Sequence, residues 1–462
     1  MSCRAPEAVR PNILFVLVDD LRWDDIAVAG HPFVETPNID RLAREGTRFL
    51  NAFAATPLCS PSRATILTGQ YAHTNGIIDN TARDSASHRL PTFAVPLSAA
   101  GYTTGFFGKW HMGNDDSPRP GWTRWVAMRG QGEAVDPQLN FDGTRRVVPG
   151  YVTDVLTDQV VEFVRGAGGK PFLAFLAHKA LHPNIMQAND GTRGAMREGQ
   201  PEGFVPAPRH VGRYAAPPIT RRPNALQSPV GKKALARAIP GLPPLSPATG
   251  TSERDIRARL EMLLGVDESL GRIVAVLDSL GTLDQTMIVF TSDHGYFYGE
   301  FGLDQERRLA YEETARIPLL VRYPPLARAG ATPSPMVQTT DFASTILEVA
   351  GVKDVAVRDG RSIVPLLVGE APADWRTSLL LEYWTDIVFP RTLTMGYKAV
   401  RTERYTYIHY TELEGMDELY DLQADPFQVD NIIDTDRGRA ALPPLQQELG
   451  RLQATAGSAP AR

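Results

Sequence analysis

The segment NILFVLVDD, residues 12–20, is the clearest indication of how this chain folds. Its run from residue 12 to residue 18 is almost continuously apolar, which is typical of a strand buried on both faces of a parallel sheet. The run ends in Asp19 and Asp20. We therefore expect the carboxyl end of this strand to deliver two carboxylates to one edge of the sheet.

The same pattern returns later in the chain. Residues 286–291 form a second β-rich apolar run, and Asp293 and His294 follow it. In open α/β sheets the ligand crevice lies beyond the carboxyl ends of the strands. Two strands that end in acidic residues therefore predict one shared site at that edge.

Strand-like and helical segments alternate over most of the chain. This alternation favours a doubly wound α/β sheet. We expect strands at residues 102–107 and 171–176, and helices at 37–45, 62–68 and 253–279.

The last part of the chain has a different pattern, because its apolar and aromatic residues alternate with polar ones. This pattern predicts a small antiparallel sheet and a terminal helix near residues 444–454. The expected fold is therefore a large mixed, mostly parallel α/β sheet flanked by helices, with a smaller C-terminal sheet and helix. We place the two domains at residues 1–376 and 377–462.

Residues 184–252 interrupt this organisation, since they are rich in Pro, Gly and Arg and show little periodicity. Loops of this length are usually functional lids or disordered. We expect this excursion to extend over the active face and to contact the substrate. Its arginines are either contacts for an acidic sugar polymer or solvated loop residues: Arg209, Arg213, Arg221 and Arg222.

Composition excludes several classes of function. A net charge of -5, with no Lys/Arg block, argues against a nucleic-acid partner but allows a small anionic substrate. No apolar run is long enough to span a bilayer, and residues 1–11 contain no signal-peptide core, so we expect a cytoplasmic protein without a membrane partner. A trimmed signal peptide would leave the same sequence. The oligomeric state is left open.

Cys59 requires its own explanation, because two cysteines, Cys3 and Cys59, form no disulfide framework. Cys59 opens the string Cys-Ser-Pro-Ser-Arg, which ends at Arg63 and precedes a helical segment. A helix N-terminus favours anions, and Arg63 adds a planar positive charge that braces an oxyanion. The alternative is that Cys59 is a small buried apolar residue and Pro61 occupies the first helical turn.

The string resembles the signature of the sulfatase family, Cys-x-Pro-Ser-Arg. Further motifs that resemble the family cover most of the chain outside the excursion, at residues 11–20, 36–40, 67–71, 108–113, 292–295, 311–313, 419–422 and 425–426. The resemblance implies an alkaline-phosphatase-like sulfatase whose Cys59 is converted to formylglycine by a formylglycine-generating enzyme. One hydroxyl of the hydrated aldehyde would attack sulfur, and the other would later expel sulfate.

A metal site is predicted from Asp19, Asp20 and Asp293. Three carboxylates suit a hard cation such as Ca²⁺ or Mg²⁺, although single strand-end aspartates often cap helices or turns. By resemblance, His294 and the modified Cys59 complete the shell. Many sulfatases carry Asn where this chain has His294, and the softer imidazole shifts the preference toward Mn²⁺. We expect Ca²⁺.

Lys109 and His111 are two residues apart after a strand, so both face one side if the extended geometry persists. By resemblance, Lys109 holds the nucleophile and sulfate oxygens, and His111 takes the proton from the second hydroxyl. His182 is the candidate general acid for the leaving alcohol, and Lys179 a sulfate contact. His178, next to Lys179, is expected to be structural.

Arg307 stands where the family usually has a sulfate-binding lysine. Either Arg307 or its neighbour Arg308 binds the sulfate in place of that lysine. The alternative is that both arginines are exposed and have no specific role.

Three functions remain open at this point. The first is hydrolysis of a small-molecule or saccharide sulfate ester, which Lys109 together with His111 favours. The second is hydrolysis of phosphonate monoesters or phosphodiesters on the same fold. The third is a non-catalytic binding protein with unmodified Cys59.

Overall fold

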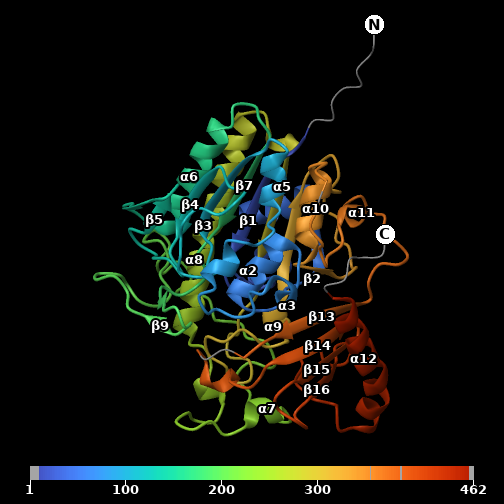
Figure 1. The fold of residues 1–462 in the computed structure, drawn as a ribbon. Coiled ribbons are helices and arrows are strands. Elements are labelled where there is room, and N and C mark those ends of the chain that lie inside the picture. Colours follow the sequence, from blue (N-terminus) through green and yellow to red (C-terminus); the bar gives the residue numbers. More distant parts are fainter. Residues whose placement is uncertain (1–9, 354, 386–387, 457–462) are drawn as a thin grey trace.

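The computed structural model describes residues 10–353, 355–385 and 388–456, so that Cys3 lies outside the described part (Figure 1). A large sheet forms its centre. The strands of this sheet are β1 (Asn12–Val18), β2 (Thr47–Phe53), β3 (Thr103–Lys109), β4 (Arg124–Met128), β5 (Gln138–Phe141), β6 (Thr144–Val147), β7 (Phe172–Ala177), β10 (Thr286–Ser292), β11 (Arg316–Arg322) and β12 (Val337–Gln338).

The strand order is β12-β2-β11-β10-β1-β7-β3-β4-β5-β6, and the five central strands from β10 to β4 run parallel. Antiparallel pairs follow on both sides, between β10 and β11, β11 and β2, β4 and β5, and β5 and β6. The predicted large, mixed and mostly parallel sheet is therefore confirmed. β1 lies at the centre of the sheet between β10 and β7, and its residues are apolar on both faces because a hydrophobic core covers each face.

The helices differ widely in length. They are α1 (Pro37–Glu45), α2 (Cys59–Thr68), α3 (Ala72–Asn75), α4 (Asp84–Ser87), α5 (Ala94–Ala99), α6 (Val152–Gly166), α7 (Lys233–Ala236), α8 (Glu253–Ser279), α9 (Glu312–Ala315), α10 (Asp341–Val349), α11 (Val364–Leu367) and α12 (Asp436–Thr455). Short 3-10 turns lie at Ala27–Ala29, Pro247–Thr249, Leu283–Gln285 and Pro390–Thr392.

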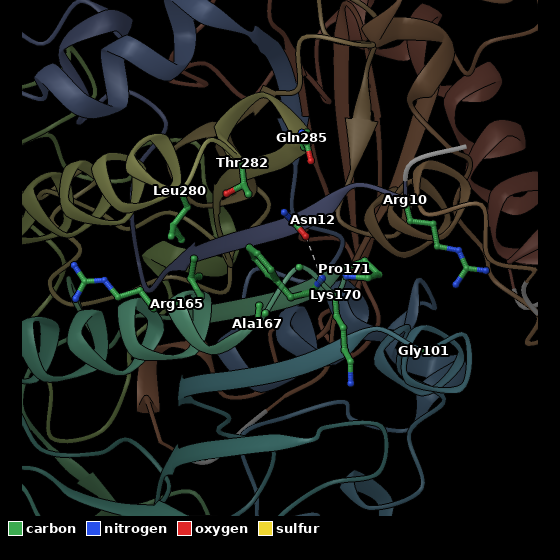
Figure 2. A pocket seen from close by; sticks show the side chains of 14 residues that line it. Arg10, Asn12, Gly101, Arg165, Ala167, Lys170, Pro171, Leu280, Thr282 and Gln285 are labelled. Atoms are coloured by element: carbon green, nitrogen blue, oxygen red, sulfur yellow. Dashed lines mark hydrogen bonds between the residues drawn. The ribbon is translucent and has the colours of Figure 1, made fainter. Parts of the chain in front are cut away.

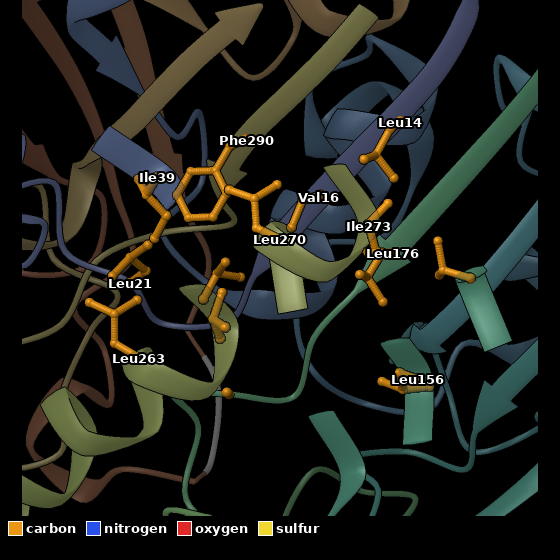
Figure 3. Close-up of a cluster of buried hydrophobic side chains, with 14 of the residues drawn as sticks. Leu14, Val16, Leu21, Ile39, Leu156, Leu176, Leu263, Leu270, Ile273 and Phe290 are labelled. Atoms are coloured by element: carbon orange, nitrogen blue, oxygen red, sulfur yellow. The ribbon is translucent and has the colours of Figure 1, made fainter. Parts of the chain in front are cut away.

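Side chains of β1 alternate between two hydrophobic cores, one on each face of the sheet. Leu14 and Val16 pack with residues of α1, α6 and α8 (Figure 3). Ile13 and Phe15 pack with residues of α2, α5 and α10 on the other face. Because successive strand residues point to opposite faces, one apolar strand serves both layers of helices.

α8 begins and ends where its sequence pattern predicts. Ser252 caps it by accepting a hydrogen bond from the backbone N–H of Asp255. Ile256, Leu260 and Leu263 form part of its buried face. The helix covers the sheet beside α6 and brings further side chains to the carboxyl end of β1.

The C-terminal sheet has the order β13 (Ser378–Tyr383), β14 (Tyr397–Thr402), β15 (Tyr405–Tyr410) and β16 (Glu418–Asp421), all antiparallel. α12 packs against it. This helix begins earlier than predicted, because Thr435 caps it at the Gly438 N–H and both Pro443 and Pro444 lie inside it. One core cluster joins this sheet to the large one, and the division into two domains stays a prediction.

The excursion has little regular structure beyond α7 and the two-residue strands β8 (Met186–Gln187) and β9 (Arg193–Gly194). Lys232 anchors it: the buried Nζ donates to the Tyr420 hydroxyl at 2.6 Å. Arg222 pairs with Asp24 at 2.7 Å and with Glu313 at 3.1 Å.

The other three arginines of the excursion also have partners within the chain. Arg209 pairs with Asp154 at 2.7 Å, the exposed Arg213 with Glu35 at 3.0 Å, and Arg221 donates to the Thr251 carbonyl at 2.8 Å. None of the helices in the described ranges is both long and apolar enough to cross a membrane.

Candidate active site

The parallel register of two strands brings the predicted carboxylates together. Val18, the last residue of β1, pairs with Ser292, the last residue of β10. The residues that follow them are therefore neighbours. Asp20 has φ 60°, and its N–H donates to a carboxylate oxygen of Asp293 at 3.1 Å. This left-handed turn is strained for a non-glycine residue, and such positions are concentrated at functional sites.

Cys59 lies against these carboxylates as the first residue of α2. Its Sγ is 3.3 Å from His294 Nε2. The helix begins three residues earlier than predicted, because Leu58 is its N-cap and the Ser62 N–H already donates to the Leu58 carbonyl at 2.9 Å. Cys59 is fully buried, and this burial agrees with either reading of the cysteine, nucleophile or core residue.

Arg63 connects the helix to both acidic strand ends. Its guanidinium lies 3.0 Å from Asp293 and 3.4 Å from Asp19, and it donates to the Lys109 carbonyl at 2.6 Å. The planar group is thus fixed on three sides. It can hold negative charge beside Cys59 without reorganising.

Four side chains form a group that could hold a metal ion. Ligand atoms of Asp19, Asp20, Cys59 and His294 all lie within 4.8 Å of one another, and all four residues are buried. Asp293 borders this group, with a carboxylate oxygen 3.9 Å from His294 Nε2.

Carboxylate oxygens that accept no hydrogen bond support the assignment of a cation to this group. Asp19 Oδ1 and both carboxylate oxygens of Asp20 are buried without a hydrogen-bond partner among the described residues. Buried carboxylate oxygens are costly unless they are paired or coordinate a cation. Burial opposes protonation of His294, but Asp293 and the Cys59 sulfur outweigh it and raise the pKa of His294 to about 9. The site therefore attracts positive charge, and its donor set fits a divalent cation.

Two buried lysines lie on the other side of Asp19. Lys109, the last residue of β3, donates from Nζ to the Asp19 carboxylate. Lys179 follows β7 and donates to the carbonyls of Gln131 and Pro183 at 3.0 and 3.1 Å. Burial and the charge of Lys109 lower the pKa of Lys179 to about 7. Both lysines thus lie where an anionic substrate would meet the carboxylates.

His111 reaches the same region by a route that the sequence did not predict. Its φ of 58° breaks the extended geometry after Lys109, so the condition under which both side chains would face one side of a strand does not hold. Its Nε2 lies 2.7 Å from the Gln187 side-chain oxygen. Burial, followed by the charge of Lys109, lowers the pKa of His111 well below its usual value, so the imidazole is neutral.

His182 and Arg307 contact one another beside Asp20. His182 donates from Nδ1 to the Pro183 carbonyl at 2.8 Å, so its Nε2 accepts from Arg307 at 2.9 Å. Arg307 also lies 3.3 Å from Asp20. Burial and the Lys109 charge lower the pKa of His182.

The alternative of two exposed arginines without a specific role is wrong, because Arg307 is 4% and Arg308 1% exposed. Arg308 pairs with Glu306 at 3.0 Å and stacks on Phe389, so the site contact falls to Arg307. His178 points away from the site, toward Ser269 Oγ of α8 at 3.4 Å.

Arg259 was missed in the sequence. It is fully buried on α8 and donates to the carbonyls of Asp20 at 2.7 Å and Leu181 at 3.0 Å, so it ties two loops of the site together. The helical spacing did indicate that Arg259 is buried. It lies three residues after Ile256 and four before Leu263, on the apolar face of a predicted helix.

A cavity of about 660 Å³ lies away from this site, next to Asn12 at the start of β1 (Figure 2). Arg10, Arg165 and Lys170 line it, but their charged ends point in different directions and do not converge on one point. This cavity therefore lacks the arrangement of the site at the carboxyl ends.

Comparison with known proteins agrees with this geometry. A family model described as Sulfatase matches residues 11–352, and one described as N-sulphoglucosamine sulphohydrolase, C-terminal, matches residues 299–455. The chain is 31% identical to N-acetylglucosamine-6-O-sulfatase of Bacteroides thetaiotaomicron, over 98% of this chain and 87% of that protein. It is 28% identical to human N-acetylglucosamine-6-sulfatase, over 92% of this chain and 81% of that protein.

A solved structure described as a complex with its substrate D-glucosamine-2-N,6-O-disulfate superposes with a TM-score of 0.83. It is 30% identical and covers 97% of this chain and 98% of its own.

Proposed function

The chain belongs to the sulfatase family and hydrolyses sulfate esters, and from this premise we propose that its substrate is a saccharide with a sulfate ester on O6 of a glucosamine unit. Support comes from the similar proteins, which act on 6-sulfated N-acetylglucosamine or hold a 6-O-sulfated glucosamine. The buried cations of the site provide the charge that a sulfate group requires, although the chain is acidic overall: Arg63, Lys109, Lys179 and Arg307.

A divalent cation, for which we propose Ca²⁺, would be held by Asp19, Asp20, Asp293 and His294 together with an oxygen on residue 59. The observation that carries this proposal is the set of buried carboxylate oxygens beside Cys59 that accept no hydrogen bond from the described residues. When bound, the cation would polarise the attacking hydroxyl and neutralise a sulfate oxygen. His294 is a softer ligand than an amide oxygen, so Mg²⁺ and Mn²⁺ are the alternatives.

Residue 59 would act as the nucleophile after oxidation of Cys59 to formylglycine by a formylglycine-generating enzyme. Its position at the start of α2, 3.3 Å from His294 and beside Arg63, supports this role. Arg63 would hold the developing negative charge through its fixed guanidinium. Lys109 would exchange its contact with Asp19 for a sulfate oxygen, and His111 would accept the proton during sulfate release.

His182 would protonate the leaving alcohol, and this role requires a rearrangement. In the structure its Nε2 accepts a hydrogen bond from Arg307, which leaves that nitrogen without a proton to donate. A sulfate bound between Arg307 and Lys179 would draw the guanidinium away and favour protonation of His182. The general acid would thus be charged only when substrate is present.

A panel of esters tests the substrate and the nucleophile together. We expect turnover of 6-sulfated N-acetylglucosamine or glucosamine, and much slower turnover of 4-sulfated galactosamine and of the N-sulfate. A phosphonate monoester belongs in the panel, because the alternative activity stays a prediction. Preference for any other ester position would contradict the proposed substrate.

The nucleophile has a separate test. The mass of the peptide that contains residue 59 reports conversion of the cysteine directly. We expect Cys59→Ala to fold and to lose turnover, and activity retained in this variant would remove Cys59 from the mechanism.

A further inference from the structure

Gln187 lies on β8, at the start of the excursion, and is hydrogen-bonded to the histidine assigned to sulfate release. Its side-chain oxygen is 2.7 Å from His111 Nε2 and accepts from the Gln131 amide at 2.8 Å. Its amide nitrogen donates to the Asn80 carbonyl at 2.8 Å. All polar atoms of the Gln187 side chain therefore have a partner.

The Asn80 carbonyl fixes the orientation of this amide. A backbone carbonyl can only accept, so the Gln187 NH₂ group must face Asn80 and its oxygen must face His111. The reverse orientation would place two acceptor oxygens 2.8 Å apart. Since the Gln187 oxygen accepts, His111 must donate to it from Nε2.

This contact determines which nitrogen of His111 carries the lone pair. A neutral imidazole has one N–H, and that N–H lies on Nε2. Nδ1 is therefore the basic nitrogen, and it is buried without a hydrogen-bond partner among the residues that the structure describes. A buried, unpartnered acceptor in an active site is available to take up a proton.

We propose that Gln187 is a positioning residue that holds His111 in the Nε2–H tautomer and so makes Nδ1 the atom that accepts the proton during sulfate release. The tautomer follows from the contacts of Gln187 alone. The consequence for turnover rests on the proposed role of His111 as base.

The same contacts link His111 to the nucleophile helix. The Asn80 side-chain oxygen accepts from the Ser60 N–H at 3.0 Å, and the Ser60 hydroxyl donates to the His111 carbonyl. Gln187, Asn80, Ser60 and His111 thus form a closed ring of hydrogen bonds next to Cys59. Gln187 is the member that comes from the excursion, so the excursion determines the state of the base.

The tautomer can be measured without any turnover. In a long-range ¹H–¹⁵N spectrum of histidine-labelled chain, the His111 signals are identified by their loss in His111→Asn. We expect the Nε2–H pattern in the wild-type chain. Gln187→Met removes the acceptor and should allow the Nδ1–H form. An Nδ1–H tautomer in the wild-type chain would overturn the proposal.

Kinetics test the consequence. Gln187→Met should lower kcat by roughly 10- to 100-fold with little change in KM, the usual effect of losing a partner that orients a functional histidine. Because release is the impaired step, the first turnover should liberate alcohol faster than sulfate.

Gln200→Met is the matched control, since Gln200 is another glutamine of the excursion whose amide donates to a backbone carbonyl, that of Val135 at 2.7 Å. Equal losses of kcat in Gln200→Met and Gln187→Met would overturn the positioning role. A wild-type chain that has the Nε2–H tautomer but hydrolyses no sulfate ester would overturn the proposed function and leave the tautomer established.

Discussion

Replacing Arg259 by Met should destabilise the protein and impair the site at the same time. The guanidinium donates to the carbonyls of Asp20 and Leu181, and lies 3.8 Å from the centre of the Tyr296 ring. Hydrogen bonds from a charged group contribute about 1.5–3 kcal/mol each, and the substitution leaves two buried carbonyls without their donor. We expect a loss of about 3–5 kcal/mol in the free energy of unfolding.

This loss translates into a measurable shift in melting temperature. An unfolding entropy of about 2.1 cal/mol/K per residue gives about 1 kcal/mol per degree for a chain of 462 residues. Arg259→Met should therefore melt about 3–5 °C below the wild type, and its kcat should fall about 10- to 100-fold because the loops that carry Asp20 and His182 lose their common anchor.

Arg254→Met is the control, since Arg254 lies on the same helix and is exposed. It should change the free energy of unfolding by less than about 0.5 kcal/mol. A melting temperature for Arg259→Met that equals that of Arg254→Met would refute the anchoring role, whatever the activity. Arg259→Lys separates charge from geometry, because an ammonium group cannot present the planar fork that reaches both carbonyls.

Three further outcomes are expected. Chelation should abolish turnover and lower the melting temperature, by about 3–4 °C if the cation was present at 100–1,000 times its Kd. Added Ca²⁺ should restore both turnover and melting temperature. An unchanged melting curve after verified metal removal would contradict the shared cation site. His182→Ala should lower kcat by about 10²- to 10⁴-fold on a sugar sulfate. The loss should be much smaller on nitrophenyl sulfate, because its leaving group departs without a general acid. Equal losses of kcat on the two substrates would assign the acid role to another group. Burial lowers the pKa of His178 to about 3 in the folded chain. In the unfolded chain His178 binds a proton below about pH 6.5, so acid favours the unfolded state. His178 should therefore contribute a fall in stability of about 1.4 kcal/mol per pH unit below that point, in addition to the other buried histidines, so the decline should be shallower in His178→Asn. Parallel pH curves for the two chains would contradict a neutral, buried His178.

The sequence alone was sufficient to predict the features that depend on a local residue pattern. Residues 12–18 and 286–291 form buried strands because a continuous apolar run is stable only where both faces are covered. α8 begins and ends as predicted because a serine cap and a 3.6-residue apolar period act within one segment. The metal-site candidates could be predicted because they directly follow these strands. Neighbouring parallel strands place the residues that follow them side by side.

Only the tertiary structure decided features that arise between distant segments. The left-handed backbone at Asp20 and His111 follows from contacts across the site and has no local sequence signature. The partners that each side chain meets after folding distinguished Arg307 from Arg308: the two are adjacent in sequence, but Arg307 contacts His182 and Arg308 contacts Glu306. Gln187 lies 76 residues from His111 in a segment without periodicity, so no local pattern could connect them. A hydrogen bond depends on where two atoms meet after folding, whereas periodicity records only which face of an element is apolar.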